Sequence, residues 1–142
     1  MHRRHKYDIL VIFSTLALAV SVYLSVAKAM SISVPCDITG GCESVLSSKY
    51  SEIMGVPLST VGIVYFSLIL VTALLANHYR KAQKALTWFL AAGSLGSLVF
   101  LFLQFFVIRA VCQYCLLTDL TTILMFILDI NIEHKAHSLN VL

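Results

Sequence analysis

Four long apolar windows constrain the fold of this chain more than any other feature. They cover residues 9–27, 53–77, 85–108 and 110–128, and only Asp119 interrupts the last. A helix rises about 1.5 Å per residue, so about 20 residues cross a hydrocarbon core of roughly 30 Å. The chain is 59% apolar and only 12% charged, which leaves too little polar surface for a soluble domain. The sequence therefore predicts an all-α integral membrane protein, a bundle of four transmembrane helices.

We expect one membrane domain over residues 1–142. Its helices should lie at about 9–29, 57–77, 85–108 and 112–130, with an outer loop at 30–56. The basic residues before the first window and the Ala-Lys-Ala run at 27–29 are also compatible with a cleaved signal peptide. However, the apolar run is longer than the roughly 7–15 residues usual in such peptides. We therefore expect the first helix to be retained.

The positions of lysine and arginine predict the orientation, because these residues are enriched in cytoplasmic loops. Seven of the ten cations precede the first window, separate the second from the third, or follow the fourth: Arg3, Arg4, Lys6, Arg80, Lys81, Lys84 and Lys135. The remaining three, Lys28, Lys49 and Arg109, lie in the other two loops. Both termini should then be cytoplasmic, in a cytoplasmic (inner) membrane. All four cysteines should face outward, where thiols can be held oxidised.

The outer loop reads "SVPCDITGGCESVLSSKYSEIMGVPLS". From Cys42 to Ile53, apolar residues recur at helical spacing with polar residues between them. This pattern predicts a short amphipathic half-helix that lies on the membrane surface. Pro57 follows a break at Gly55 and is suited to be the first residue of the second span.

The four cysteines form two pairs with different settings. Cys112 and Cys115 are a Cys-X-X-Cys motif at the start of the last helix, where free backbone N–H groups and the helix dipole favour a thiolate on the first cysteine. Cys36 and Cys42 flank two glycines in the outer loop. Thiol–disulfide exchange between the pairs would relay electrons from outside the membrane to its edge.

Two other uses of these cysteines stay open. Two inert disulfides could staple the outer loops of a non-catalytic membrane protein. A site with four cysteine ligands could hold zinc, although the oxidising compartment and the apolar neighbours of Cys115 argue against a metal.

Asp119 follows the motif within the last window. Cys112, Cys115 and Asp119 occupy one stripe of a helix, with Asp119 about 6 Å deeper than Cys115. A carboxylate in a membrane is costly and usually faces the bundle interior or water. Asp119 could relay a proton or donate a hydrogen bond, or it could simply be satisfied by neighbouring threonines. Together with a dithiol, this acid suggests a quinone as the acceptor, because a quinone is apolar, has two carbonyls and takes two electrons with two protons.

Aromatic and small residues in the spans are ambiguous. Tyr65 and Phe66 in the second window could line an apolar ligand pocket or only pack. Gly93, Gly96 and the serines beside them suit close approach of neighbouring helices. Tyr114 lies where an interfacial aromatic belt is expected.

The segments "CDITGGCESVLSSKYSEIMGVPLSTVG" and "CQYCLLTD" resemble the bacterial vitamin K epoxide reductase family. The resemblance spans roughly the first to the fourth helix. The order of the cysteines, the loop serine, the Gly-Val-Pro-Leu-Ser entry to the second helix and the late Cys-X-X-Cys all agree. It implies a four-helix bundle around a quinone, with the half-helix of the outer loop acting as a lid.

The resemblance also implies roles for individual residues. Cys115 would adjoin the quinone and Cys112 would be its partner, while Cys42 would exchange with Cys112. Cys36 would take electrons from an outside partner, and Ser48 matches a serine near the shuttle cysteines. Two positions differ from the animal relatives: Asp119 replaces a quinone-contacting tyrosine, and Leu58 replaces a quinone-contacting asparagine.

The expected function is that of a membrane thiol oxidase that supports disulfide-bond formation. Several bacterial relatives carry a fused thioredoxin-like domain, and this chain ends at Leu142, so we expect a separate exported thioredoxin-fold partner. The acceptor would be a ubiquinone or menaquinone-type quinone in the surrounding lipid, without metal or nucleic acid. An alternative is the same chemistry with the reduced quinone, or reduced vitamin K epoxide, as the useful product.

Overall fold

The computed structural model describes residues 4–141, and four long helices account for most of them. These are α1 (Arg4–Ala29), α3 (Leu58–Ala76), α4 (Arg80–Phe102) and α5 (Gln113–Val141). A π-helical turn, η2 (Leu103–Ile108), prolongs α4. All four are long and apolar enough to cross a membrane, which confirms the predicted fold class. Of the cations used to predict the orientation, Arg3 lies outside the described residues.

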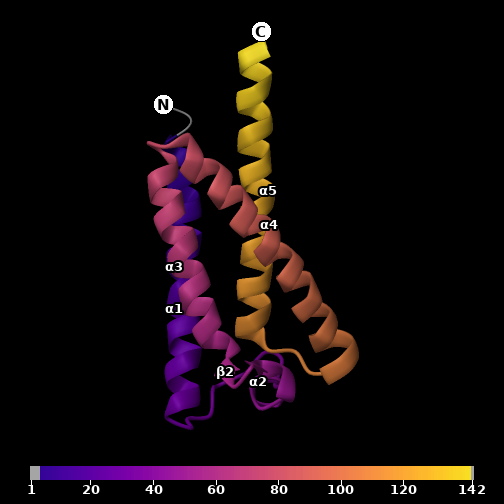
Figure 1. Ribbon diagram of the computed structural model, residues 1–142. Coiled ribbons are helices and arrows are strands. Elements are labelled where there is room, and N and C mark those ends of the chain that lie inside the picture. The colour runs from indigo at the N-terminus through magenta and orange to yellow at the C-terminus, as the bar shows by residue number, and fades with distance from the viewer. Residues whose placement is uncertain (1–3, 142) are drawn as a thin grey trace.

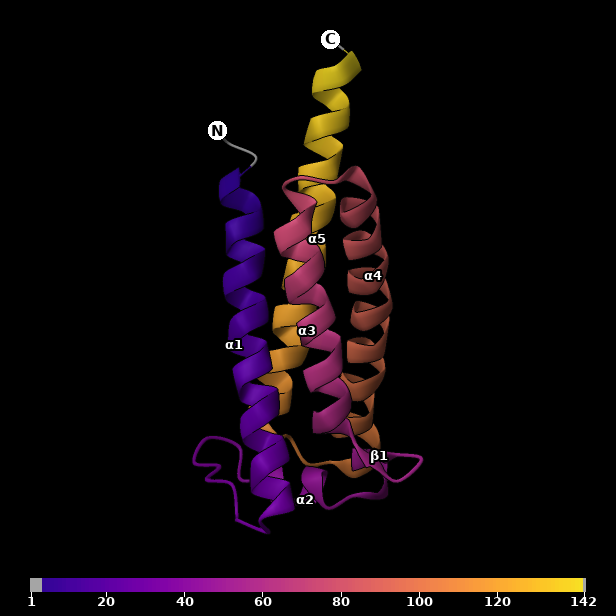
Figure 2. The same cartoon turned by 60° about the vertical axis from the view of Figure 1, so that its left-hand side comes forward.

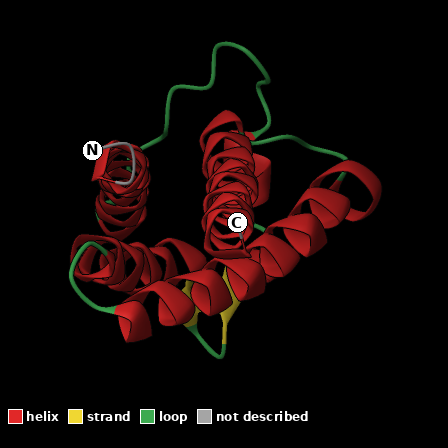
Figure 3. Cartoon of the chain, turned by 90° about the horizontal axis from the view of Figure 1, so that it is seen from above, coloured by secondary structure: helices red, strands yellow, loops and turns green. Residues whose placement is uncertain are grey.

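The four helices form a closed ring. Helix α1 packs on α3, α3 on α4, α4 on α5 and α5 on α1, as the view along the bundle shows (Figure 3). The first and last described residues lie at one end of the bundle (Figure 1). The outer loop and the connection between α4 and α5 lie at the opposite end, which therefore carries all four cysteines.

The outside of the bundle is apolar. Only 17–28% of the residues in the most apolar window of each helix are buried inside the protein. Large side chains such as Leu16 and Leu95 are exposed on the outer faces. Such a surface is unfavourable in water but is compatible with lipid as the solvent, so the chain is a multi-pass membrane protein.

The tightly packed core lies in the half of the bundle that is nearer the termini. Its fully buried members come from all four helices and include Leu10, Ile69, Leu90 and Met125. Phe66 belongs to the same cluster and also lines a cavity toward the cysteine end. The bundle is thus well packed in one half and hollow in the other.

The outer loop differs from its prediction in length and type. The half-helix exists, but α2 covers only Cys42–Leu46 and is followed by a 3-10 turn, η1 (Lys49–Ser51). The hydroxyls of Ser47 and Ser48 donate to the carbonyl oxygens of Glu43 and Val45. The chain leaves the helix here, since the backbone of Ser48 is extended, with φ of −67° and ψ of 154°. Helical spacing of the apolar residues alone did not mark this break.

A β-hairpin replaces the rest of the expected helix (Figure 2). Strand β1 (Glu52–Ile53) pairs antiparallel with β2 (Val56–Pro57), and the intervening Met54 and Gly55 both have positive φ, as a tight hairpin turn requires. Pro57 therefore ends a strand and immediately precedes α3, rather than being its first residue as predicted.

Candidate functional site

The outer-loop pair is a disulfide between Cys36 and Cys42, whose Cα atoms lie 5.9 Å apart. Cys42 is the first residue of α2 and is fully buried, while Cys36 is partly buried in the loop before it. Gly40 lies between them with φ of +64°, a conformation that glycine adopts without strain. The backbone N–H of Gly40 donates to the carbonyl of Cys36, which closes the turn that brings the two sulfurs together.

The second pair, Cys112 and Cys115, is a pair of free thiols. The Cys115 thiol donates to the Sγ of Cys112 across 2.7 Å, and the backbone N–H of Cys115 points to the same sulfur at 3.3 Å. These hydrogen bonds, with that of the Cys115 thiol the strongest, lower the pKa of Cys112 below the usual thiol value. Cys112 is therefore the sulfur of this pair that is prepared to be a thiolate.

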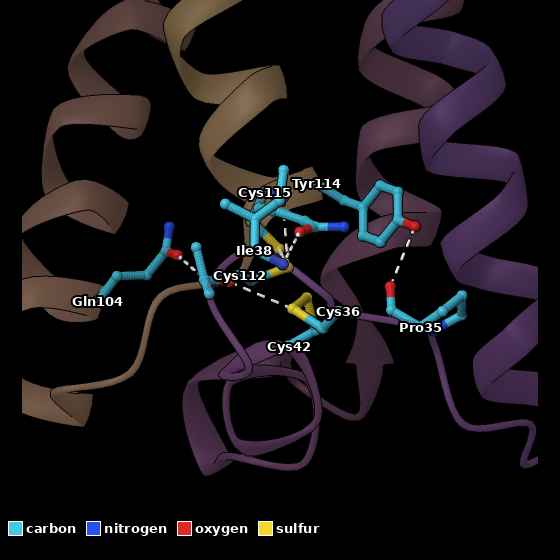
Figure 4. Close-up of a disulfide and its surroundings, with 10 residues drawn as sticks. Pro35, Cys36, Ile38, Cys42, Gln104, Cys112, Tyr114 and Cys115 are labelled. Atoms are coloured by element: carbon cyan, nitrogen blue, oxygen red, sulfur yellow. Dashed lines mark hydrogen bonds between the residues drawn. A yellow bond between two sulfur atoms is a disulfide. The ribbon is translucent and has the colours of Figure 1, made fainter.

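The two pairs belong to one buried cluster at the end of the bundle (Figure 4). Cys42, Val45 and Cys112 form its buried part, and Cys36 and Cys115 pack against it. The loop approaches closely here, because a Cβ added to Gly41 would lie 2.7 Å from both the nitrogen and the oxygen of Val111. The absence of a side chain at Gly41 thus allows Cys42 to lie beside the Cys-X-X-Cys motif.

Gln113 and Tyr114, the two middle residues of the Cys-X-X-Cys motif, form hydrogen bonds with the outer loop. The phenol of Tyr114 donates to the carbonyl of Pro35 at 3.1 Å, and Ile38 N–H donates to the side-chain oxygen of Gln113 at 3.2 Å. Cys36 lies between these two attachment points (Figure 4). Sequence reasoning treated Tyr114 as an interfacial aromatic residue and did not find this contact.

A cavity of about 300 Å³ lies between the cysteines and the packed core. Its floor includes Phe66, and its opposite side is covered by α2, η1 and β1 of the outer loop. Most of the lining is apolar. Polar side chains reach it from two sides. Lys28, Ser48 and Ser51 line it beside the outer loop, and α4, η2 and α5 contribute Ser97, Gln104, Cys115, Thr118 and Asp119.

Apart from the loop cysteines Cys36 and Cys42, every site residue predicted from the sequence lies at this cavity or next to it. Cys115, Asp119, Ser48, Tyr65 and Phe66 all line it, as does Leu58 at the start of α3. Cys112 does not line the cavity itself, but its Sγ lies 2.7 Å from the Sγ of Cys115, which does. These positions bring the candidates together, while their individual roles stay predictions.

Tyr65 is held in a fixed position at the cavity wall. Its hydroxyl donates to the carbonyl of Phe89 at 3.0 Å, and its ring meets that of Phe66 edge-on with centroids 5.1 Å apart. A Cβ added to Gly93 would overlap the Tyr65 hydroxyl. Gly93 therefore makes room for one aromatic side chain, rather than only for helix contact as predicted, whereas Gly96 has no atom within 4 Å of such a Cβ.

Gln104 is a polar residue of the site that sequence reasoning missed. It lies in the π-helical turn η2 and is only 3% exposed. Its side-chain oxygen accepts from the backbone N–H of Cys112 at 2.9 Å, and its nitrogen donates to Asp119 at 3.4 Å. The only sequence signal for this residue is that it is an uncharged polar side chain inside the apolar window 85–108.

Comparison with known protein families matches residues 9–130 to the Vitamin K epoxide reductase family. The match covers most of the chain and all four cysteines. The chain belongs to this family. Members are membrane oxidoreductases that act on thiols and quinones, so this chain is a membrane thiol–disulfide oxidoreductase. Its disulfide and the two nearby free thiols are compatible with that chemistry.

The family's electron partner, a quinone, fits the donor set of the cavity. An apolar wall would enclose a ring and part of a tail, and Asp119, Gln104 and Cys115 gather on one side of it. Among residues 4–141, no group of three or more His, Cys, Asp or Glu side chains is placed to hold a metal ion. Two of the four cysteines are in any case joined to each other, so they do not offer thiolate ligands.

Proposed function

We propose that this protein relays electrons from an exported thioredoxin-fold dithiol to a membrane quinone and so supports disulfide-bond formation outside the cytoplasm. The observation that carries the proposal is the burial of Cys42 and Cys112 in one cluster, with the free Cys115 at the cavity wall. An inert pair of loop staples would not need a dithiol beside a cavity.

The first exchange occurs at the loop disulfide. Two thiols of the partner become a disulfide, and Cys36 and Cys42 become thiols. Cys36 is the sulfur that the partner meets, because it is less buried than Cys42 and lies in the outer loop. The loop flanking Cys36 exposes Ile38 strongly, which gives a partner an apolar contact beside the disulfide.

The second exchange occurs inside the protein. The Cys42 thiolate attacks Cys112 in a Cys112–Cys115 disulfide and displaces Cys115 as a thiolate. Cys36 then attacks Cys42, which closes the loop disulfide again and releases Cys112. The lowered pKa of Cys112 supports this order, because a thiolate of lower pKa is the better leaving group. After this step the loop pair is oxidised and the Cys112–Cys115 pair is reduced.

The final exchange takes place at the cavity. When bound there, a quinone of the ubiquinone or menaquinone type would accept two electrons and two protons. Cys115 borders the cavity and Cys112 lies behind it at 2.7 Å, so the two thiols give up the electrons and become a disulfide. Asp119 lines the same wall, which supports a role in holding or transferring one of the protons.

The distribution of lysine and arginine among the loops supports the orientation of the protein in the membrane. With both termini in the cytoplasm, the cysteine end faces outward in the inner membrane. The reduced partner then reaches Cys36 from the oxidising compartment, while the quinone enters from the lipid.

The test is turnover by the purified protein with a reduced thioredoxin-fold partner and quinones, followed by quinone absorbance. Cys115→Ala should abolish quinone reduction, with both the protein partner and a small dithiol as the donor. The double variant Cys36→Ala/Cys42→Ala should lose turnover with the protein partner but keep part of it with the small dithiol. Unchanged turnover in Cys115→Ala would remove the assignment.

A glutathione titration separates this function from structural disulfides. Structural disulfides resist reduction until the potential falls below about −300 mV, whereas exchanging pairs titrate at higher potentials. Two pairs that both resist reduction would favour the non-catalytic alternative.

A further inference from the structure

Gln104 connects the dithiol to the carboxyl group at the cavity. Its oxygen accepts from the backbone N–H of Cys112, and its nitrogen donates to Asp119 Oδ2. Ser97 and Asp119 both line the cavity. Gln104 is only 3% exposed, and both ends of its amide bond to protein groups. The connection is therefore made inside the protein, between two groups that belong to different turns of the last segment.

The orientation of this amide is fixed by its neighbours. A backbone N–H can only donate, so the amide oxygen must face Cys112. The amide nitrogen must then face away from Cys112, and it meets Asp119. A flipped amide would set two donors against each other at Cys112, and a buried unpaired N–H costs about 1–3 kcal/mol. Gln104 thus presents a donor to Asp119 as long as Cys112 stays in place.

The π-helical turn explains how the amide reaches both groups. Such turns insert an extra residue into a helix and are frequent at functional sites. Here the turn covers Leu103–Ile108, at the end of α4 that faces the Cys-X-X-Cys motif. Its neighbours Phe105 and Phe106 are exposed on the outside, while Gln104 alone in this turn is buried. The widened turn therefore directs one polar side chain inward.

We propose that Gln104 is a positioning residue that holds Cys112 at the start of α5 and ties it to Asp119, so that the dithiol and the carboxyl group keep a fixed relation at the cavity. This inference deepens the proposed quinone reduction and rests on it for its purpose. The position of Cys112 also affects the thiolate when no quinone is bound. With Cys112 held, its sulfur stays under the N–H of Cys115, which supports the thiolate.

The first test measures the redox equilibrium of Cys112–Cys115 with glutathione, without quinone or partner. All variants are made in the Cys36→Ala/Cys42→Ala background, so that one pair alone titrates. Gln104→Leu should make the pair about tenfold easier to oxidise, a potential about 30 mV more negative, because the thiolate loses support. Gln104→Glu keeps an acceptor for the Cys112 N–H and should stay within about twofold of the background.

The second test measures quinone turnover in the chain with all four cysteines. Gln104→Glu should lower kcat/KM about tenfold, because it replaces the donor to Asp119 by a second carboxyl group. The exchanged pair Gln104→Glu/Asp119→Asn restores one amide and one carboxyl group. Its thermal stability should exceed that expected from adding the losses of the two single variants.

Gln83→Leu is the matched control. Gln83 donates to the carbonyl of Ala76 at the opposite end of the bundle, so its loss should change stability without changing the redox equilibrium. The proposal is overturned if Gln104→Leu leaves the equilibrium unchanged, or if Gln83→Leu shifts it equally. It is also overturned if the exchanged pair shows only additive losses. Wild-type protein that titrates normally but reduces no quinone would instead remove the proposed function.

Discussion

Gly41 lies so close to Val111 that a methyl group on its Cα would stand 2.7 Å from the backbone nitrogen and oxygen of Val111. This contact joins the residue before Cys42 to the residue before Cys112. The distance between the two sulfur pairs therefore depends on a position that has no side chain.

Gly41→Ala should separate the loop from the motif and slow electron transfer between the two pairs at least about tenfold. The added carbon cannot be accommodated by a rotamer change, because the clashing atoms are backbone. Rapid acid quenching and thiol labelling after addition of reduced partner would show the loop pair reduced while Cys112–Cys115 stays oxidised.

Gly40→Asn is the matched control for that experiment. A Cβ at Gly40 meets nothing within 4 Å, and asparagine tolerates its φ of +64° better than most residues do. Transfer in this variant should stay near the wild-type rate. Equal slowing in both variants would mean that general loosening of the loop, and not the contact with Val111, controls the exchange.

Tyr114→Phe should loosen the loop around Cys36. The variant removes the hydrogen bond to Pro35, and a net loss of about 1 kcal/mol corresponds to about fivefold more frequent opening. Hydrogen exchange at the Ile38 amide, which is bonded to Gln113, would report this change. Tyr79→Phe, at the other end of the bundle, should leave that amide unaffected. No acceleration in Tyr114→Phe would show that the phenol does not restrain the loop.

The spans and the cysteine pairs could be predicted from sequence because their signals are local. Long uncharged windows specify membrane helices without knowledge of their neighbours, and a Cys-X-X-Cys at a helix start brings two thiols together by helical geometry alone. The family resemblance added the expectation that Cys42 exchanges with Cys112. Its cysteine order was preserved in full, which is why the family assignment was correct.

The contacts that organise the site could not be predicted, because they depend on which helices face each other. Gln104 is a single amide in an apolar window, and its two partners lie on a different segment. Asp129 is a similar case: it is 1% exposed and accepts from Thr87 of α4, but it falls just after the predicted apolar window. The half-helix was overestimated because the spacing of apolar residues does not show that the backbone becomes extended at Ser48.

Gly93→Ala should destabilise the protein by about 1–3 kcal/mol, the usual range for overpacking. The new methyl group would overlap the hydroxyl of Tyr65, which is tied to Phe89 and cannot move freely. Thermal unfolding in detergent measures the effect. Gly96→Ala, where the methyl group meets nothing within 4 Å, should be neutral or stabilising by up to about 1 kcal/mol, because alanine is the better helix former. Adding Tyr65→Leu should relieve most of the loss in Gly93→Ala; if it does not, the clash is not the cause.

The pH dependence of Cys112 alkylation tests the electrostatics of the dithiol. The hydrogen bond from Cys115 lowers the pKa of Cys112, so its thiolate should persist to lower pH than that of an ordinary thiol, whose pKa is about 8.5. Reactivity should fall only as the pH drops through this lowered value. Cys115→Ala removes the main cause and should move the midpoint up toward the ordinary value. Rates are normalised to their high-pH plateau, since Cys112 is buried and reacts slowly in both proteins. Coinciding midpoints would show that Cys115 does not stabilise the thiolate, and the leaving-group role of Cys112 would lose its physical basis.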